Sequence, residues 1–287
     1  MVSKGRPAHP PPVARRGGSG PALRLVPALR YTHSQMATGF PTITAHTGCE
    51  DTAENTVASA LAGLSLGADA VEVDVRADAQ GRLYLWHDDE VHTTDSGSLA
   101  VSELRLRDLL ELERCGRIRF DHPQGRITTL HDLLGALANL PGRVNLDLKD
   151  DRSASLAGEA VNRAGFADRV LASGCSMPRA RLFRRLNTLL PVFLNSDFGS
   201  ARTPVSPARA EQESAAAADA GCCGLNIHHR LCSPVVVEAA RKRSLLVSVW
   251  TVGARDGFER YIAMGVDNIT TRDVRALVEV RERMRSR

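Results

Sequence analysis

Hydrophobic and polar residues alternate in several short runs of this chain, as they do in strands that bury one face. In residues 70–75, valine occupies every second position on one face, while Glu72 and Asp74 occupy the other. Residues 144–149 alternate in the same way. Other β-rich runs bring the number of predicted strands to nine, and they lie at 42–46, 83–87, 169–172, 191–195, 224–227, 245–251 and 266–270.

Helical patterns separate most of these strands. Apolar residues recur at spacings of three and four in residues 55–66, and Ser233-Pro234 and Gly265 carry the residue types of a helix start and a helix end. Alternating strands and helices over about 245 residues predict an α/β fold, a closed (β/α)8 TIM barrel. Nine strands are one too many for it, and the pattern does not tell which one is extra.

The link between the strands at 70–75 and 83–87 is too short for a helical crossover. Its seven residues, extended, span roughly 23 Å, and a five-residue strand spans only about 17 Å. The link is therefore long enough to return along the barrel, and we predict that the two strands are parallel. His87 would then reach the C-terminal mouth together with Asp74, where barrel enzymes place their active sites.

The stretch that follows is too long for a simple loop. Residues 88–143 contain helical patterns near 102–113 and 129–138. We interpret the second pattern as a barrel helix. The rest is predicted to be an insertion after the third strand, at about 88–128, on the C-terminal face of the barrel.

Charged residues on the polar faces of two strands point to a metal. In a barrel covered by helices the apolar faces meet the helices, so Glu72, Asp74, Asp147 and Lys149 point inward. An uncompensated buried charge is costly. A divalent cation is the simplest partner, because hard cations take carboxylate oxygens. The alternative is an antiparallel sheet with these residues exposed to solvent.

Three further residues fit phosphate chemistry. The chain has three lysines against 34 arginines, so Lys149 at an inward position suggests a compact charge that contacts a phosphate oxygen. His46 and His87 end strands beside the carboxylates, and histidine suits proton transfer near neutral pH. Five other histidines are interpreted as structural: His92, His122, His131, His228 and His229.

The composition of the chain differs from that of a globular domain mainly at the N-terminus. The net charge is +4, but residues 1–40 hold six basic residues and no acidic one, which leaves 31 basic against 33 acidic residues from 41 onward. We interpret residues 1–40 as a disordered extension rich in Pro, Gly and Arg, with Met36 as an alternative start, and residues 41–287 as the catalytic domain. The mildly acidic domain gives no support for nucleic-acid binding.

Cysteine usage and hydropathy bear on the compartment. Six scattered cysteines without a C-x-x-C pair indicate reduced thiols, and no apolar run is long enough to span a bilayer. A secretory signal pattern is also missing from the start of the sequence. These features predict a cytoplasmic protein.

Ordered motifs from about residue 42 to 275 resemble the glycerophosphodiester phosphodiesterase family, within the phosphatidylinositol-phospholipase-C-like superfamily of TIM-barrel phosphodiesterases. His46-Thr47-Gly48 with Ala53-Glu54-Asn55-Thr56 is similar to its H-R-G and P-E-N-T segments. The other matching segments are G-A-D-A-V-E-V-D-V at 67–75, Gly81 with His87-Asp88, N-L-D-L-K at 145–149, V-W-T-V at 249–252 and G-V-D-N-I at 265–269.

The resemblance implies roles for several residues. Glu72, Asp74 and Asp147 correspond to the metal ligands, which usually hold Mg²⁺ or Ca²⁺, and His46 and His87 correspond to the catalytic pair. Lys149 corresponds to a phosphate contact. The implied substrate is a small glycerophosphodiester or a lysophospholipid, attacked by the neighbouring glycerol hydroxyl.

The chain departs from the family pattern at several positions. Thr47 replaces the arginine of H-R-G, Ala53 the proline of P-E-N-T, Asp147 a glutamate, and Arg272 an acidic or amide residue. Asp at the third ligand also occurs in sphingomyelinase D-like phospholipases. A lysophospholipase D or sphingomyelinase D-like activity is therefore one alternative, and a non-catalytic phosphodiester-binding protein is another.

The substrate-facing residues are less determined. We place Thr47, Glu54 and Asn55 near the substrate, although Glu54 and Asn55 would equally orient His46 or cap the first helix. Trp250 alternates inward, either to line an apolar side of the pocket or to fill the core. The head group, the choice of metal and the oligomeric state stay open.

Overall fold

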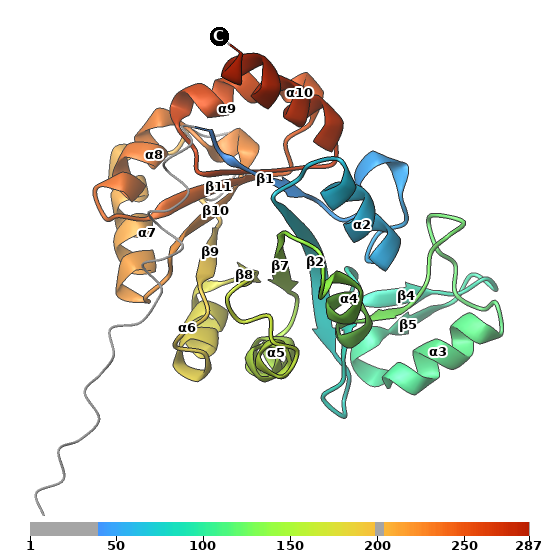
Figure 1. Ribbon diagram of the computed structural model, residues 1–287. Coiled ribbons are helices and arrows are strands. Elements are labelled where there is room, and N and C mark those ends of the chain that lie inside the picture. Colours follow the sequence, from blue (N-terminus) through green and yellow to red (C-terminus); the bar gives the residue numbers. More distant parts are fainter. Residues whose placement is uncertain (1–39, 199–203, 287) are drawn as a thin grey trace, which may run out of the picture.

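A closed ring of parallel strands forms the centre of the computed structural model, which describes residues 40–198 and 204–286 (Figure 1). β1 pairs in parallel with both β2 and β12, which closes the ring. The predicted TIM barrel is thus confirmed, whereas the predicted extension, apart from Phe40, lies outside the described residues. The eight ring strands are β1 (Thr42–Ala45), β2 (Ala70–Ala77), β7 (Arg143–Leu148), β8 (Val170–Cys175), β9 (Val192–Ser196), β10 (Gly224–His228), β11 (Leu246–Trp250) and β12 (Asn268–Thr271).

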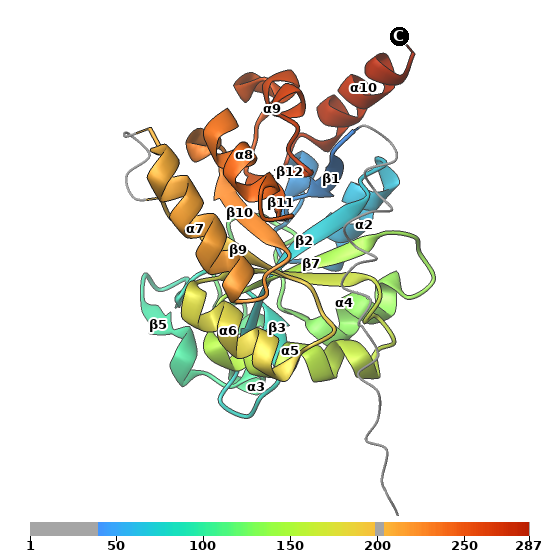
Figure 2. The ribbon, with the colours of Figure 1, turned by 90° about the vertical axis from the view of Figure 1, so that its left-hand side faces the viewer.

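Helices surround the ring, and α5, α6 and α7 follow one another along one side of it (Figure 2). The apolar faces of the strands pack against them: Val71, Val73, Val144 and Leu146 all belong to one buried hydrophobic cluster. The predicted inward and outward faces are therefore confirmed. The covering helices are α2 (Val57–Ser65), α4 (Leu130–Leu137), α5 (Asp151–Arg163), α6 (Met177–Leu186), α7 (Pro207–Asp219), α8 (Pro234–Arg241), α9 (Phe258–Met264) and α10 (Val274–Arg285), with short 3-10 turns at Cys49–Asp51, His229–Leu231 and Ala254–Asp256.

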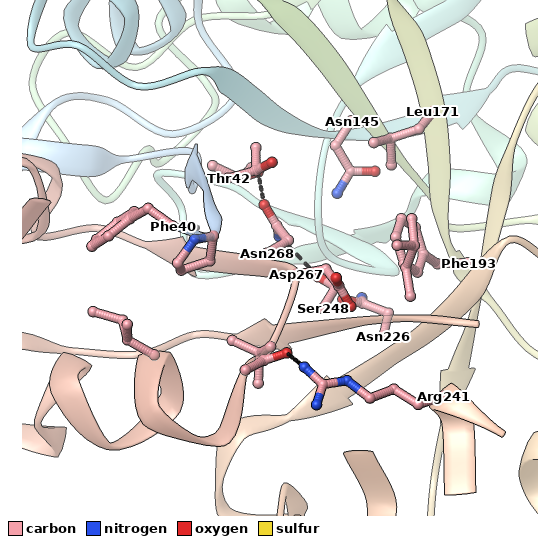
Figure 3. Close-up of a pocket in the computed structure, with 16 residues that line it drawn as sticks. Phe40, Thr42, Asn145, Leu171, Phe193, Asn226, Arg241, Ser248, Asp267 and Asn268 are labelled. Carbon is pink, nitrogen blue, oxygen red and sulfur yellow. Dashed lines mark hydrogen bonds between the residues drawn. The ribbon is translucent and has the colours of Figure 1, made fainter. Parts of the chain in front are cut away.

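The inside of the barrel is largely polar. Asn145, Asn226 and Ser248 point into a cavity of about 230 Å³ at the N-terminal end, with Leu171 and Phe193 on one wall (Figure 3). This cavity contains none of the inward carboxylates, so it is separate from the predicted site at the opposite end. Polar side chains point inward along the strands toward the C-terminal end as well, so the predicted site borders a polar interior.

The predicted direction of the strand at 83–87 is wrong. β3 (Leu83–Leu85) pairs antiparallel with β2 and is not part of the ring, so it is also the extra strand of the nine. The physical reason is that β2 continues three residues beyond Asp74 and the chain then turns back sharply. Asp78 accepts the backbone N–H groups of Gln80 and Arg82, and Gly81 has a φ of +81°.

The hairpin nevertheless delivers His87 to the mouth. Because β2 overshoots Asp74, the returning strand reaches the level of Asp74 again at Trp86, whose N–H donates to the Asp74 carbonyl at 3.1 Å. His87 is the next residue. The antiparallel strand therefore carries His87 to the same end of the barrel that a parallel strand would have reached.

The insertion follows β3, the third strand along the chain, as predicted. It has its own small hydrophobic cluster, which includes Tyr84, Val91, Leu109 and Ile127. Figure 1 shows α3 with β4 and β5 beside α4. Its elements are β4 (Glu90–His92), β5 (Ser98–Ala100), a 3-10 turn (Val101–Glu103), α3 (Leu106–Arg114) and β6 (Thr128–Thr129).

Candidate active site

Three carboxylates meet at the C-terminal mouth of the barrel. Glu72 and Asp74 come from β2, and Asp147 on the adjacent β7 lies in register with Asp74. One oxygen from each carboxylate lies within 4.8 Å of the other two. Among the described residues, Asp147 Oδ1 has no hydrogen-bond partner although it is buried. An all-oxygen donor set with one unsatisfied buried oxygen fits a divalent cation.

Lys149 balances part of this negative charge. Its Nζ lies 2.8 Å from Asp74 Oδ1 and 3.3 Å from Asp147 Oδ2. Three ionised carboxylates and one ammonium still leave two negative charges on the group. A divalent cation would bring the sum to zero.

The pKa values of the carboxyl groups reflect this crowding. Burial, followed by repulsion from Asp74 and Asp147, raises the pKa of Glu72 well above its usual value. Burial likewise raises the pKa of Asp147. Burial also acts to raise the pKa of Asp74, but the Lys149 ammonium and the Asn55 amide outweigh it and the pKa is lowered.

Asn55 fixes Asp74 from two sides. The Asn55 amide donates to Asp74 Oδ2 at 2.8 Å, and the Asp74 N–H donates to Asn55 Oδ1 at 2.9 Å. Asn55 is buried and adopts a φ of +58°, a conformation that asparagine tolerates. The cap of α2 is Thr56, which accepts from the Ser59 N–H. The capping role considered for Asn55 is therefore wrong.

His46 follows β1 at the edge of the carboxylate cluster. Its Nδ1 lies 2.8 Å from the Thr47 carbonyl oxygen and 3.8 Å from Glu72 Oε2. Burial lowers the pKa of His46, and the nearby guanidinium of Arg272 acts in the same direction. A neutral imidazole is thus favoured at this position.

His87 stands on the insertion side of the mouth. Its Nδ1 lies 2.7 Å from Asp88 Oδ1, and both side chains are 58% exposed. A carboxylate accepts hydrogen bonds, so Nδ1 carries the proton and the ring is oriented through it. His87 and His46 thus have different surroundings: His87 is exposed beside a carboxylate, whereas His46 is partly buried beside a guanidinium.

Arg272, which directly follows β12, contacts the loop that follows β1. Its Nη2 forms an ion pair with Glu54 Oε1, and its Nε lies 3.3 Å from His46 Nδ1. Glu54 therefore caps no helix and instead holds Arg272 beside His46. Arg272, which replaces the acidic or amide residue usual in the family, is thus paired with the carboxylate of Glu54 from the loop after β1.

Thr47 is turned away from the mouth. Only 2% of the residue is exposed, and its Oγ1 accepts from the Asn55 N–H. Its own N–H donates to Glu72 Oε2 at 3.1 Å. Thr47, at the position of the family arginine, thus supports the carboxylate of Glu72 through its backbone.

The comparison with known proteins decides the family. Residues 44–276 match the glycerophosphoryl diester phosphodiesterase family. The chain belongs to this family. It is therefore a phosphoric diester hydrolase that acts on glycerophosphodiesters, and the resemblance drawn from its motifs is confirmed.

Three relatives illustrate the degree of similarity. A glycerophosphodiester phosphodiesterase of Caldanaerobacter subterraneus subsp. tengcongensis is 25% identical over 244 residues, which cover 83% of this chain and 96% of the relative. The structure of an Oleispira antarctica phosphodiesterase in complex with the product sn-glycerol-3-phosphate has 20% identity and a TM-score of 0.68, covering 89% of this chain and 99% of that one. A glycerophosphodiester phosphodiesterase structure from Parabacteroides distasonis has 21% identity and a TM-score of 0.68, with coverage of 86% and 100%.

Trp250 stands across the ring from the carboxylates. In the strand order, β10 and β11 lie opposite β2 and β7. The Trp250 ring meets the His228 ring edge to face, with centroids 5.5 Å apart. Its Nε1 is buried and has no partner in the described part of the chain. The pair forms an aromatic wall on the far side of the mouth.

Several supporting residues escaped the sequence analysis. Gly174 packs directly on Asp147, and nothing in the sequence near it marks that role. His92 and His122, interpreted as structural, line a pocket beside His87. Asp88 could have been found, because it follows His87 directly in a family motif.

Of the helices that the structure describes, none is long and apolar enough to cross a membrane.

Proposed function

We propose that residues 41–287 act as one catalytic domain that converts glycerophosphodiesters to an alcohol and glycerol 3-phosphate with Mg²⁺ or Ca²⁺. The observation that carries this proposal is the convergence of three carboxylates, one lysine and two histidines at one end of the barrel. A structurally similar phosphodiesterase has been solved with sn-glycerol-3-phosphate as its product.

Glu72, Asp74 and Asp147 are the residues that would hold the cation. Such a cation supplies Lewis-acid polarisation of a phosphoryl oxygen. Lys149 adds a positive charge from the protein itself. An ammonium has three donors, and two of them face Asp74 and Asp147. The third is available for a phosphate oxygen.

His46 is the proposed general base. The Thr47 carbonyl only accepts, and its 2.8 Å contact with His46 Nδ1 is shorter than the 3.3 Å contact with Arg272 Nε. Nδ1 therefore carries the proton, and the lone pair of Nε2 is free to take one. That proton comes from the attacking oxygen, either the adjacent glycerol hydroxyl or water, as its bond to phosphorus forms.

His87 is the proposed general acid. Asp88 orients the imidazole ring through the 2.7 Å contact between its Oδ1 and His87 Nδ1, which leaves Nε2 to deliver a proton. The His87 proton moves to the oxygen of the leaving alcohol as its bond to phosphorus breaks. If a cyclic phosphate forms first, water opens it with the two histidines in exchanged roles.

The test is an assay of alcohol release from glycerophosphocholine, glycerophosphoethanolamine and a lysophospholipid, with Mg²⁺, with Ca²⁺ and with EDTA. We expect metal-dependent turnover. His46→Ala and His87→Ala should each lose about 10²- to 10⁴-fold in kcat, the usual contribution of a general acid or base.

His131→Ala is the matched control, because His131 lies on α4 and lines no part of the mouth. Its kcat should equal that of the wild type. Turnover confined to the lysophospholipid would select a lysophospholipase D activity. Tight metal binding without turnover on any diester would contradict catalysis and leave a binding role.

A further inference from the structure

A second pocket adjoins the reaction centre on the insertion side. It has a volume of about 250 Å³ and lies between the loop after β1 and residues 119–126 of the insertion. His87 and Asn55 are part of its wall, whereas the three carboxylates are not. The pocket is therefore next to the site of bond cleavage and not the cation site itself.

His87 ties this pocket to one arm of the diester. A general acid must reach the oxygen of the alcohol that departs. His87, the proposed acid, lines the pocket together with its partner Asp88. The departing alcohol consequently lies on this side of the mouth, and the aromatic wall of Trp250 and His228 lies on the other.

The charges of the pocket nearly cancel. Its guanidinium groups belong to Arg119, Arg126 and Arg272, and its carboxylates to Asp51, Glu54, Asp88 and Asp121. Such a lining has no strong preference for an anionic or a cationic head group. It offers many hydrogen-bond donors and acceptors at short range.

The aromatic residues of the pocket do not form a cage. Trp86 and Phe120 meet edge to face, with ring centroids 6.1 Å apart and planes at 69°. A quaternary ammonium is held by the faces of several rings. The two rings here leave an apolar edge beside a polar lining, which suits the carbon skeleton and the hydroxyl groups of a sugar-like alcohol.

We propose that this pocket, here named the insertion pocket, binds the leaving alcohol and selects polyhydroxylated alcohols such as glycerol and inositol. The inference rests on the proposed function, since it takes His87 as the acid. Arg126 and Asp121 supply a donor and an acceptor from the insertion. Both side chains are exposed in the pocket lining, and within residues 40–198 and 204–286 neither is found in an ion pair, so each is available to a hydroxyl group.

The experiment compares four esters of glycerol 3-phosphate: those of glycerol, inositol, choline and ethanol. The leaving arm of the ethyl ester is uncharged and has no hydroxyl group. We expect kcat/KM for the two polyol esters to exceed that for the choline and ethyl esters by about tenfold or more, the effect of one or two well-placed hydrogen bonds to charged groups.

Arg126→Ala and Asp121→Ala test the pocket directly. Each should lower kcat/KM for the polyol esters by about fivefold or more and leave the ethyl ester within about twofold. Arg117→Ala is the matched control, because Arg117 belongs to the same segment, pairs with Asp95 and does not line the pocket. It should change none of the four values.

Three results would overturn the inference: a choline ester that is cleaved as well as the polyol esters, a lysophospholipid that is cleaved better, or variants that slow all four esters equally. In each case cleavage of the ethyl ester would still support the phosphodiesterase itself. Absence of metal-dependent turnover on every ester, including the ethyl ester, would remove the proposed function and the inference with it.

Discussion

Gly174 and Asp147 are in direct contact, and the contact leaves no room for a side chain. A Cβ atom on Gly174 would lie 1.6 Å from Asp147 Oδ1. Gly174 belongs to β8, beside an irregularity in its pairing with β9, and has a φ of +71°. The bulged strand thus forms the back wall of the third carboxylate.

Gly174→Ala should therefore displace Asp147 and weaken metal binding. We expect the affinity for Mg²⁺ or Ca²⁺ to fall about 10- to 100-fold, the usual effect of disturbing a group that supports a ligand. Titration calorimetry measures it. Gly165→Ala is the control, because Gly165 has the same φ of +71° and an added Cβ there would meet no atom within 4 Å. Equal loss of affinity in both variants would contradict the steric explanation.

Asn55→Gly tests the support of Asp74. Glycine accepts the φ of +58° at this position, so the turn is kept while both hydrogen bonds to Asp74 are lost. Metal affinity should fall about 10- to 100-fold. Thr56→Ala, which removes the cap of α2, should cost about 1 kcal/mol of stability and leave metal binding unchanged. Calorimetry and urea unfolding of both variants separate the two effects.

The faces of the ring strands could be predicted from the sequence, and with them the inward carboxylates. Alternation has a period of two, so one register places Glu72, Asp74 and Asp147 on the same side. The valines and leucines on the opposite face of these strands belong to the hydrophobic cluster, so that face packs against the helices. This part of the site follows from local pattern alone.

The direction of β3 could not be predicted in this way. A seven-residue link permits both a return along the barrel and a tight turn, and the outcome depends on the length of β2 and the hydrogen bonds of Asp78. The supporting contacts of Asn55, Gly174 and Arg272 were also out of reach. Each joins segments that lie far apart in the sequence, and neither spacing nor composition records such contacts.

Lys149→Met should destabilise the metal-free protein. Without the ammonium, Asp74 and Asp147 face each other with no positive partner, and loss of one member of a buried ion pair costs about 3–5 kcal/mol. A bound cation replaces the missing charge, so added Mg²⁺ or Ca²⁺ should raise the melting temperature more in the variant than in the wild type. Calorimetric melting with EDTA and with metal measures both.

Lys242→Met is the control for that experiment. Lys242 is exposed and pairs with Glu211 and Glu238 on the outside of the barrel. Its replacement should leave the melting temperature and the response to metal as in the wild type. If Lys149→Met lost the same stability with and without metal, its role would be packing rather than charge balance.

Asp78 fastens the insertion to the barrel. It is 1% exposed, and its Oδ2 accepts the Leu106 N–H at the start of α3 at 2.9 Å. The same carboxylate accepts the Arg82 Nε at 3.0 Å and holds the turn before β3. One side chain thus connects β2, the hairpin and the first helix of the insertion.

Asp78→Asn should accordingly destabilise the protein in a pH-dependent way. Burial acts to raise the pKa of Asp78, but hydrogen bonds from the Leu106, Arg82 and Gln80 N–H groups outweigh it, and its pKa lies below the ordinary value of 3.8. A carboxylate with a lowered native pKa contributes stability above its unfolded pKa and loses it as the pH falls through the native value. We therefore expect the variant to lose about 1–3 kcal/mol in urea unfolding at neutral pH, and the difference from the wild type to shrink below a pH of 3.8. Asp95→Asn is the control, because the ion pair of Asp95 with Arg117 is exposed to solvent, and this variant should change the stability far less. A stability difference that stays constant as the pH falls would show that the charge of Asp78 is not what fastens the insertion.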